Sequence, residues 1–287
     1  MTIAIVTDSS ACLPTEVIEE YGITVMPLNL IFGDKTYRDG IDITPTQFYT
    51  LLQKSETIPT TSAPSTGHFI NVYRRLAQNA DGIICILISS KLSASYEAAI
   101  QAKDLAKEGL PNTAIEVIDS HTTSNALGFI VRETARAAAG GSMDEAMAVA
   151  HDMMERVRFF AALDTLKYLA KGGRIGRAAA WSGNLLRIKP VLTISNDTGE
   201  VSGVERPRTK SKAIERVLEI MREEVGKNPV HVAVAHANAS SEAQHLKDKV
   251  SEVFDCLELS VAEFTPVLGT HVGPGLVGVI FYTEKNT

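Results

Sequence analysis

Two clusters of hydroxyl side chains are the first candidates for chemistry in this sequence. One is Thr60-Thr61-Ser62-Ala63-Pro64-Ser65, and the other is Ser89-Ser90-Lys91-Leu92-Ser93-Ala94-Ser95, directly after an apolar run that ends near Ile88. Both clusters are expected where strands end or helices begin, and there hydroxyls and free backbone N–H groups can bind an anion. Hydroxyl side chains are also common helix caps, so either cluster alone is better explained by capping.

Two further clusters combine glycine with basic side chains or with a histidine. Lys171-Gly172-Gly173-Arg174-Ile175-Gly176-Arg177 is a cationic glycine turn, and its structural interpretation is a helix C-cap with basic residues near the helix dipole. Gly269-Thr270-His271-Val272-Gly273-Pro274-Gly275 places one histidine between glycines, which favours a site residue over a core residue. The pattern GxGxxG occurs at residues 273–278, but a predicted strand follows it, so it does not indicate a dinucleotide site.

Asp8 is a further candidate because it stands at the end of the first predicted strand. A phosphatase of the haloacid type would need a second aspartate two residues on, where Ser10 stands. Asp8 is therefore predicted to be structural, or to line a pocket. The sequence contains no GxSxG, GxxxxGK[ST] or HExxH motif, and no cluster supplies an activated nucleophile, paired carboxylates or metal ligands. Together the clusters predict a receptor for one carboxylate or phosphate.

Composition narrows the class of protein. The 287 residues include 28 Lys and Arg against 34 Asp and Glu, and this net charge of −6 does not favour binding to nucleic acid or to an anionic membrane. Cys12, Cys85 and Cys256 form no CxxC pair, which favours reduced thiols. No apolar run approaches the ~18 residues of a membrane span, and no signal peptide is indicated. We therefore expect a soluble, cytoplasmic protein.

The first half of the chain alternates strand-like and helix-like segments, which must position the candidate residues. Strands are predicted over residues 3–7, 23–32, 35–38, 82–89 and 114–119. Helices are predicted over 14–20, 45–53, 65–79, 95–107 and 123–139, and Ser142 and Glu145 form a capping box that opens another helix to about residue 156. This alternation predicts an α/β domain over residues 1–157, with a mostly parallel sheet covered by helices.

The second half predicts a smaller α+β sandwich over residues 158–287. Residues 188–195 and 200–205 flank Asn196-Asp197-Thr198-Gly199, which is a hairpin signature. Helices are predicted over 209–225 and 241–253, and strands over 230–235, 257–262 and 277–282.

In this order the clusters resemble the DegV family, the fatty-acid-binding proteins of bacteria. The resemblance covers nearly the whole chain and rests on residues 7–10, 61–65, 89–96, 119–120, 166–175, 189–192, 208–210 and 269–275. It implies two α/β domains with a long-chain fatty acid in the cleft between them. It also implies that the chain is the lipid-binding subunit of a fatty acid kinase, whose catalytic subunit uses ATP to make acyl phosphate for phospholipid synthesis.

The resemblance also assigns roles to residues. It implies that Thr61, Ser62 and Ser93 hold the carboxylate, with His271 beside it. A protonated His271 would offset the charge that develops on the acyl phosphate. Arg208 matches the basic residue needed for kinase-dependent turnover, although Arg206 is close enough to leave this assignment open. Arg174 is expected in phosphoryl transfer or partner docking, and Ala94 replaces the usual glycine of the family. Neither a cofactor nor a metal is implied.

Two alternatives remain. One is an enzyme, a small-molecule phosphotransferase or hydrolase that uses His271 and Asp8. The other is a cytosolic lipid store with no kinase partner.

Overall fold

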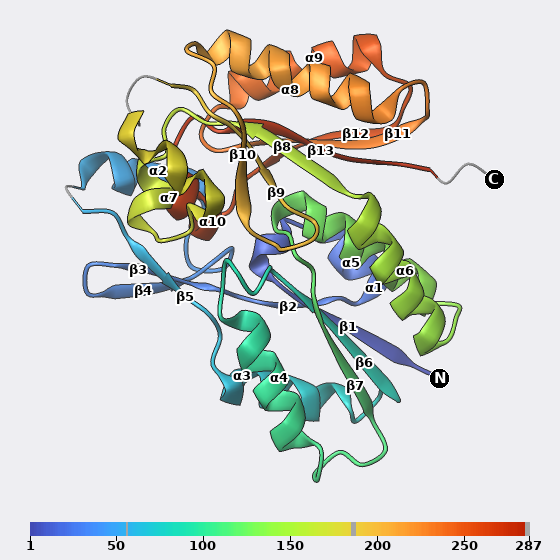
Figure 1. Cartoon of the computed structure of the whole chain (residues 1–287). Helices are drawn as coiled ribbons and strands as arrows, with labels where there is room; N and C mark the ends of the chain where they lie inside the picture. The colour runs from blue at the N-terminus through green and yellow to red at the C-terminus, as the bar shows by residue number, and fades with distance from the viewer. Residues whose placement is uncertain (56, 185–187, 285–287) are drawn as a thin grey trace. The chain divides into compact units, whose positions relative to one another are not determined.

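The computed structural model describes residues 1–55, 57–184 and 188–284, and its contacts divide the chain into two units (Figure 1). The first unit consists of Met1–Asp42, Thr61–Glu155 and Asn196–Gly199. The second consists of Ile43–Thr60, Arg156–Ser195 and Glu200–Thr287. The sequence predicted a single domain boundary after residue 157. In the structure, residues 43–60 instead belong to the second unit, and residues 196–199 belong to the first. The two units are of similar size, whereas the sequence had indicated a smaller second one.

The first unit is built on a parallel sheet. Its four strands lie in the order β2 (Thr24–Met26), β1 (Ile3–Asp8), β6 (Gly82–Leu87) and β7 (Ala114–Asp119). All six residues of β6 are buried, as expected for a continuous apolar run at the centre of a parallel sheet. The mostly parallel sheet predicted for the first half of the chain is confirmed.

Helices cover both faces of this sheet (Figure 1). α3 (Thr66–Leu76) and α4 (Ser95–Ala106) cover one face, while α1 (Thr15–Tyr21) and α5 (Ser124–Ala138) cover the other. On the α3 side, Phe69 and Tyr73 pack with Val6 and Ile83 in one apolar core. α6 (Met143–Arg156) begins at the predicted capping box, because the Glu145 carboxylate accepts from the Ser142 N–H at 2.7 Å.

A small three-stranded sheet joins the first unit. β3 (Asn29–Phe32) and β4 (Lys35–Arg38) form a hairpin, and Gly33 adopts the left-handed conformation that the turn requires, with φ of 62°. β5 (Thr60–Ser62) pairs with β3. The sequence had indicated a loop here, because three polar residues carry no alternation that would mark a strand.

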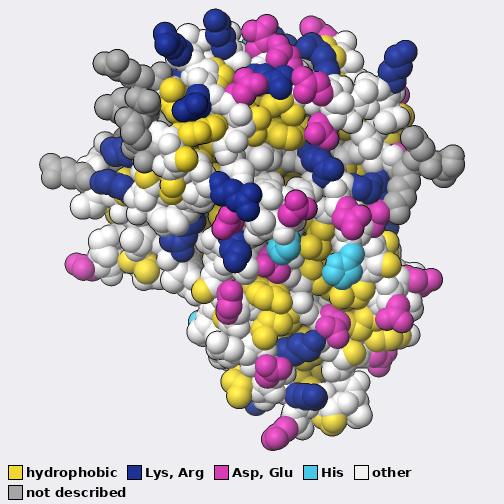
Figure 2. Space-filling model, viewed as in Figure 1, with side chains coloured by type: hydrophobic (Ala, Val, Ile, Leu, Met, Phe, Trp, Pro, Cys, Tyr) yellow, Lys and Arg dark blue, Asp and Glu magenta, His cyan; other side chains and the backbone are white. Residues whose placement is uncertain are grey.

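The second unit is built on a six-stranded mixed sheet. The strand order is β10 (Val201–Glu205), β9 (Val191–Ile194), β8 (Arg158–Ala162), β13 (Val277–Thr283), β11 (Val230–His236) and β12 (Cys256–Glu263). Only β11 and β12 are parallel neighbours. α8 (Lys210–Val225) and α9 (Ser240–Val253) pack their apolar faces on this sheet, and Figure 2 shows charged side chains of both signs over their outer surface.

Three shorter elements complete the second unit. They are α2 (Pro45–Lys54), α7 (Lys167–Lys171) and α10 (Pro266–Val272), and a 3₁₀ segment covers Gly176–Asn184. α2 contacts α10, and a Cβ added to Gly269 would lie 2.8 Å from the Phe48 ring. This close approach explains why segment 43–60 belongs to the second unit. The two-domain α/β class is confirmed, and none of the described helices is long and apolar enough to cross a membrane.

Candidate functional site

The hydroxyl cluster at residues 89–95 follows the end of β6 in the parallel sheet. β1 leads to β2 on one side, and its other neighbour is β6, so the strand order reverses at β1. Open α/β sheets bind ligands beyond the carboxyl ends of their strands at such a point. The groups placed there are Asp8 at the end of β1, Ser89 and Ser90 after β6, and Asp119 at the end of β7.

Asp8 is buried in the first unit, and its carboxylate links the end of β1 to the residue that follows β6. It is completely buried and accepts hydrogen bonds from Ser10 N at 3.0 Å, Ser10 Oγ at 2.5 Å and Ile88 N at 3.0 Å. Burial raises the pKa of Asp8 to about 6, and these hydrogen bonds oppose the rise. The contacts favour the structural role predicted for Asp8, because both carboxylate oxygens are occupied.

The loop after β6 is a tight turn organised by Ser89. The Ser89 carbonyl accepts from Leu92 N at 2.9 Å and from Ser93 N at 3.1 Å, while the Ser89 hydroxyl donates to the Gly199 carbonyl at 2.8 Å. Ser90 N donates to Asp119 Oδ1 at 3.1 Å. These bonds fix the backbone on which Ser93 stands.

Ser93 is oriented by a buried serine that the sequence analysis did not single out. Ser93 Oγ lies 2.9 Å from Ser95 Oγ and accepts from Ser95 N at 3.3 Å. Ser95 is completely buried, whereas Ser93 is half-buried. If the Ser95 hydroxyl donates to Ser93, the Ser93 hydrogen is left for a ligand. The spacing Ser-x-Ser before a helix was the available sequence signal.

Thr61 and Ser62 lie in β5, in the same unit as Ser93. Thr61 is half-buried and Ser62 is exposed. Ser62 Oγ accepts from the Asn29 amide at 3.3 Å, so the Ser62 hydroxyl keeps its own hydrogen for another acceptor. Ser62 is therefore suited to donate to an anion, and Thr61 as a ligand stays a prediction.

His271 lies in α10 of the second unit, packed against a glycine. The sequence had indicated a loop, but Thr265-Pro266 opens a helix that ends at Val272. A Cβ added to Gly172 would lie 2.5 Å from His271 Nδ1, so only glycine fits there. Arg174 donates to the Gly172 carbonyl at 2.5 Å. The structure thus brings His271 and Arg174 together around Gly172.

The protonation state expected for His271 needs correction. Burial and, to a smaller extent, the nearby positive charge of Arg174 together lower the pKa of His271 to about 4. The imidazole is therefore neutral near pH 7. A role that depends on a resident imidazolium is not supported, whereas a neutral imidazole can still donate one hydrogen bond.

Comparison with known proteins places these residues in a family. A family model described as "Uncharacterised protein, DegV family" matches residues 2–284. The chain belongs to the DegV family. A DegV domain-containing protein of Streptomyces coelicolor is 39% identical over 281 residues, which cover 97% of each chain.

Solved structures of DegV proteins are similar over the same length. A fatty-acid-binding DegV family protein of Thermus thermophilus is 31% identical with a TM-score of 0.91, covering 99% of this chain and 100% of that one. DegV of Bacillus subtilis, a fatty acid binding protein, is 32% identical with a TM-score of 0.90 and the same coverage. A stearic-acid-binding protein of Eubacterium ventriosum is 29% identical with a TM-score of 0.89, covering 99% of this chain and 98% of that one.

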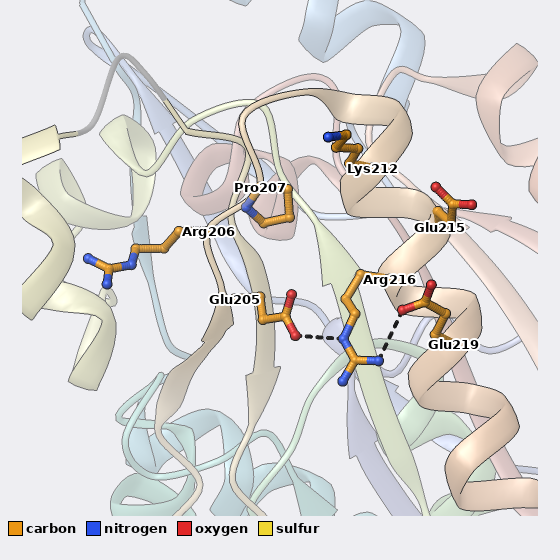
Figure 3. A pocket seen from close by; sticks show the side chains of 7 residues that line it. All are labelled: Glu205, Arg206, Pro207, Lys212, Glu215, Arg216 and Glu219. Carbon is orange, nitrogen blue, oxygen red and sulfur yellow. Dashed lines mark hydrogen bonds and ion pairs between the residues drawn. The ribbon is translucent and has the colours of Figure 1, made fainter.

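The choice between Arg206 and Arg208, which the DegV resemblance left open, can now be examined. The Arg206 guanidinium lies 5.3 Å from the centre of the Trp181 ring, and Arg206 also lines a hollow of about 400 Å³ beside α8. Figure 3 shows that it extends away from Arg216, which pairs with Glu205 at 2.6 Å. Arg208 is exposed, and its side chain forms no hydrogen bond or ion pair with residues that the structure describes. The assignment of the functional role to Arg208 stays a prediction.

Metal chemistry finds no support within the described ranges. Among residues 1–55, 57–184 and 188–284, no group of three or more His, Cys, Asp or Glu side chains could hold a metal ion. His231 and His236 lie in β11 at an odd spacing, and each faces a different glutamate, Glu258 and Glu263 respectively.

Proposed function

We propose that this chain binds one long-chain fatty acid and holds its carboxylate through the hydroxyls of Thr61, Ser62 and Ser93, with His271 as a further contact. The observation that carries the proposal is the arrangement of hydroxyls in the first unit. Ser62 accepts a hydrogen bond from Asn29, which leaves the Ser62 hydrogen for an anion, and the Ser93 hydrogen is left in the same way when the Ser95 hydroxyl donates to Ser93. The DegV relatives that bind fatty acids support the identity of the anion.

Energetics supports this assignment. Moving a C16 chain from water into protein gains roughly 0.8 kcal/mol per buried methylene, or roughly 10 kcal/mol before the costs of ordering. The carboxylate must lose water, which is tolerable only when several donors replace it. Three hydroxyls, two from β5 and one from the loop after β6, can supply those donors without a buried cation.

We further propose that the lipid-loaded chain is presented to an ATP-dependent kinase subunit in the cytoplasm. In that step a carboxylate oxygen attacks the γ-phosphorus of ATP, the bond to the bridging oxygen of ADP breaks, and acyl phosphate and ADP result. Arg208 and Arg174 are proposed to assist phosphoryl transfer or docking, because a guanidinium matches phosphate oxygens in a bidentate fashion. The enzymatic alternative is less favoured, because Asp8 is completely buried and already engaged.

The test begins with native mass spectrometry of the purified chain, in which a co-purified acyl lipid would identify itself. Titration with palmitate and oleate then compares the wild type with Ser93→Ala. The loss of one donor to a charged acceptor should weaken binding roughly tenfold. Ser251→Ala, which removes an exposed hydroxyl from α9, is the control. A chain that carries no acyl lipid and binds neither acid would refute the proposal.

The kinase step needs its own experiment. ATP and fatty acid are incubated with the chain alone and then with a fatty acid kinase catalytic subunit. We expect acyl phosphate only in the second case. Formation of acyl phosphate by the chain alone would instead support the enzymatic alternative.

A further inference from the structure

Asp164 is the centre of an ion-pair network in the second unit. It follows β8, and its Oδ1 lies 3.1 Å from Lys210 Nζ and 3.2 Å from Lys189 Nζ. Lys189 Nζ also donates to the Asp164 carbonyl at 3.3 Å. Burial alone would raise the pKa of Asp164, but the two lysines outweigh it and the net pKa is lowered. The carboxylate is therefore charged and bound to both lysines at neutral pH.

The Asp164 carboxylate also lies close to Gly275, in the glycine loop that precedes β13. Gly275 has φ of 94°, and a Cβ added to it would lie 2.4 Å from Asp164 Oδ2. Lys210 Nζ donates to the Gly275 carbonyl as well as to Asp164. Asp164 and Lys210 thus hold Gly275 from two sides, and only a glycine permits this approach.

Three segments that are distant in the sequence meet at this network. Lys189 lies just before β9, and its N–H donates to the Pro207 carbonyl at 2.7 Å. Lys210 is the first residue of α8, two residues after Arg208. Gly275 lies four residues after His271. Arg208, which the proposed function places in phosphoryl transfer or docking, and His271, which it places beside the carboxylate, therefore lie close in sequence to residues that Asp164 joins.

We propose that Asp164 is a positioning residue, whose ion pairs with Lys210 and Lys189 fix the segment that carries Arg208 relative to the glycine loop after His271. The expected effect of Asp164 on kinase-coupled turnover rests on the proposed function. Its role in fixing the two segments does not. Exposure differs across the network, since Lys210 is 17% exposed, Lys189 33% and Asp164 43%. Lys210 donates both to Asp164 and to the Gly275 carbonyl, so it constrains the two segments more than an exposed surface ion pair would.

Hydrogen exchange tests the structural part without any kinase or lipid. The amides of Lys189, Lys212 and Gly275 are hydrogen-bonded and report on the three segments. In Asp164→Asn we expect exchange at these amides to be at least about tenfold faster, the effect of losing one charge-assisted hydrogen bond. Glu224→Gln is the matched control, because Glu224 has the same 43% exposure and pairs with Arg158 at 3.5 Å. Unchanged exchange in Asp164→Asn would overturn the proposal.

Kinase-coupled turnover tests the functional part. The lipid-loaded chain is the varied substrate and the kinase subunit is the enzyme. A positioning role predicts that Asp164→Asn lowers kcat about tenfold while the KM for the chain changes less than about twofold. A merely unstable variant would reduce the concentration of folded chain, which raises the apparent KM and leaves kcat unchanged. That second pattern would overturn the functional part of the proposal.

A double variant completes the test. Because Asp164 and Lys210 act as one unit, Asp164→Asn combined with Lys210→Met should lower kcat no further than the more severe single variant. Additive losses would overturn the proposal. If the wild-type chain supports no acyl phosphate formation with a kinase, the kinase part of the proposed function fails, and hydrogen exchange still decides the structural role of Asp164.

Discussion

Replacing His271 should change how the stability of the second unit depends on pH. Burial and Arg174 lower the pKa of His271 from 6.5 to about 4. The folded chain therefore holds this imidazole neutral, whereas the unfolded chain protonates it below about pH 6.5. The stabilisation is present above pH 6.5 and is lost as the pH falls from 6.5 towards 4. His271→Gln removes the titration and keeps a polar side chain of similar length.

The magnitude follows from the difference between the two pKa values. One pKa unit corresponds to 1.36 kcal/mol. The difference between 6.5 in the unfolded chain and about 4 in the folded chain therefore changes the free energy of unfolding by about 3 kcal/mol when the imidazole of the unfolded chain becomes fully protonated. His271 is half-buried by its overall exposure, and we therefore expect about 2–3 kcal/mol. Asp8 acts in the opposite sense. Its pKa is raised from 3.8 to about 6, so its contribution is lost as the pH rises through that interval.

Asp8 and His271 change the stability in opposite directions as the pH changes, so a stability curve of the wild type alone would hide the contribution of His271. The assay therefore compares the wild type with His271→Gln at each pH. Urea unfolding is followed by the fluorescence of Trp181, the single tryptophan, which lies in the second unit. The free energy of unfolding of the wild type minus that of His271→Gln should fall by about 2–3 kcal/mol between pH 7 and pH 4. A difference that stays constant within about 0.5 kcal/mol would refute the reasoning. So would an NMR titration of the imidazole with a midpoint near 6.5.

Three further predictions concern buried contacts. Ser95→Ala should weaken fatty acid binding about fivefold in calorimetry although Ser95 is buried, because it frees Ser93 to rotate; unchanged affinity would contradict this. Asp8→Ala leaves three buried donors without an acceptor and should destabilise the first unit by at least about 2 kcal/mol in chemical unfolding. Gly172→Ala should displace the ring of His271 and lower stability by about 1–3 kcal/mol, and an unshifted melting temperature would show that the ring has room.

The parallel sheet of the first unit could be predicted because strand-like segments alternate with helix-like segments in this half of the chain. Residues 82–87 form an unbroken apolar run, residues 114–119 combine apolar residues with Glu116 and Asp119, and the structure confirms both strands. β8 was missed because its five residues follow α6 with no turn residue between them. α10 was missed because its glycines suggested a loop. The signal that marks its start, Thr265-Pro266, is the same as Thr44-Pro45 at the start of α2.

Residue types were enough to propose candidate site residues, but not to predict their contacts. Hydroxyl clusters are local signals that contain Ser93 and Thr61, and the role of these two residues as ligands stays a prediction. The contact of His271 with Gly172 joins residues about a hundred positions apart, and no local pattern specifies it. The same is true of Asp164 and Lys210, because a single aspartate after a short strand has no distinctive neighbours. Those contacts depend on how the sheet of the second unit pairs its strands.

The place of β13 in its sheet bears on how this chain folds during synthesis. β13 is the last strand along the chain, but it lies between β8 and β11 at the centre of the six strands. Residues 158–162 leave the ribosome long before residues 277–283, so the edge of β8 that pairs with β13 stays unpaired until β13 has been synthesised. That strand carries Phe159 and Phe160, and an unpaired apolar edge invites aggregation. The parallel sheet of the first unit is complete at Asp119, so the nascent second unit is the part that a chaperone would have to protect.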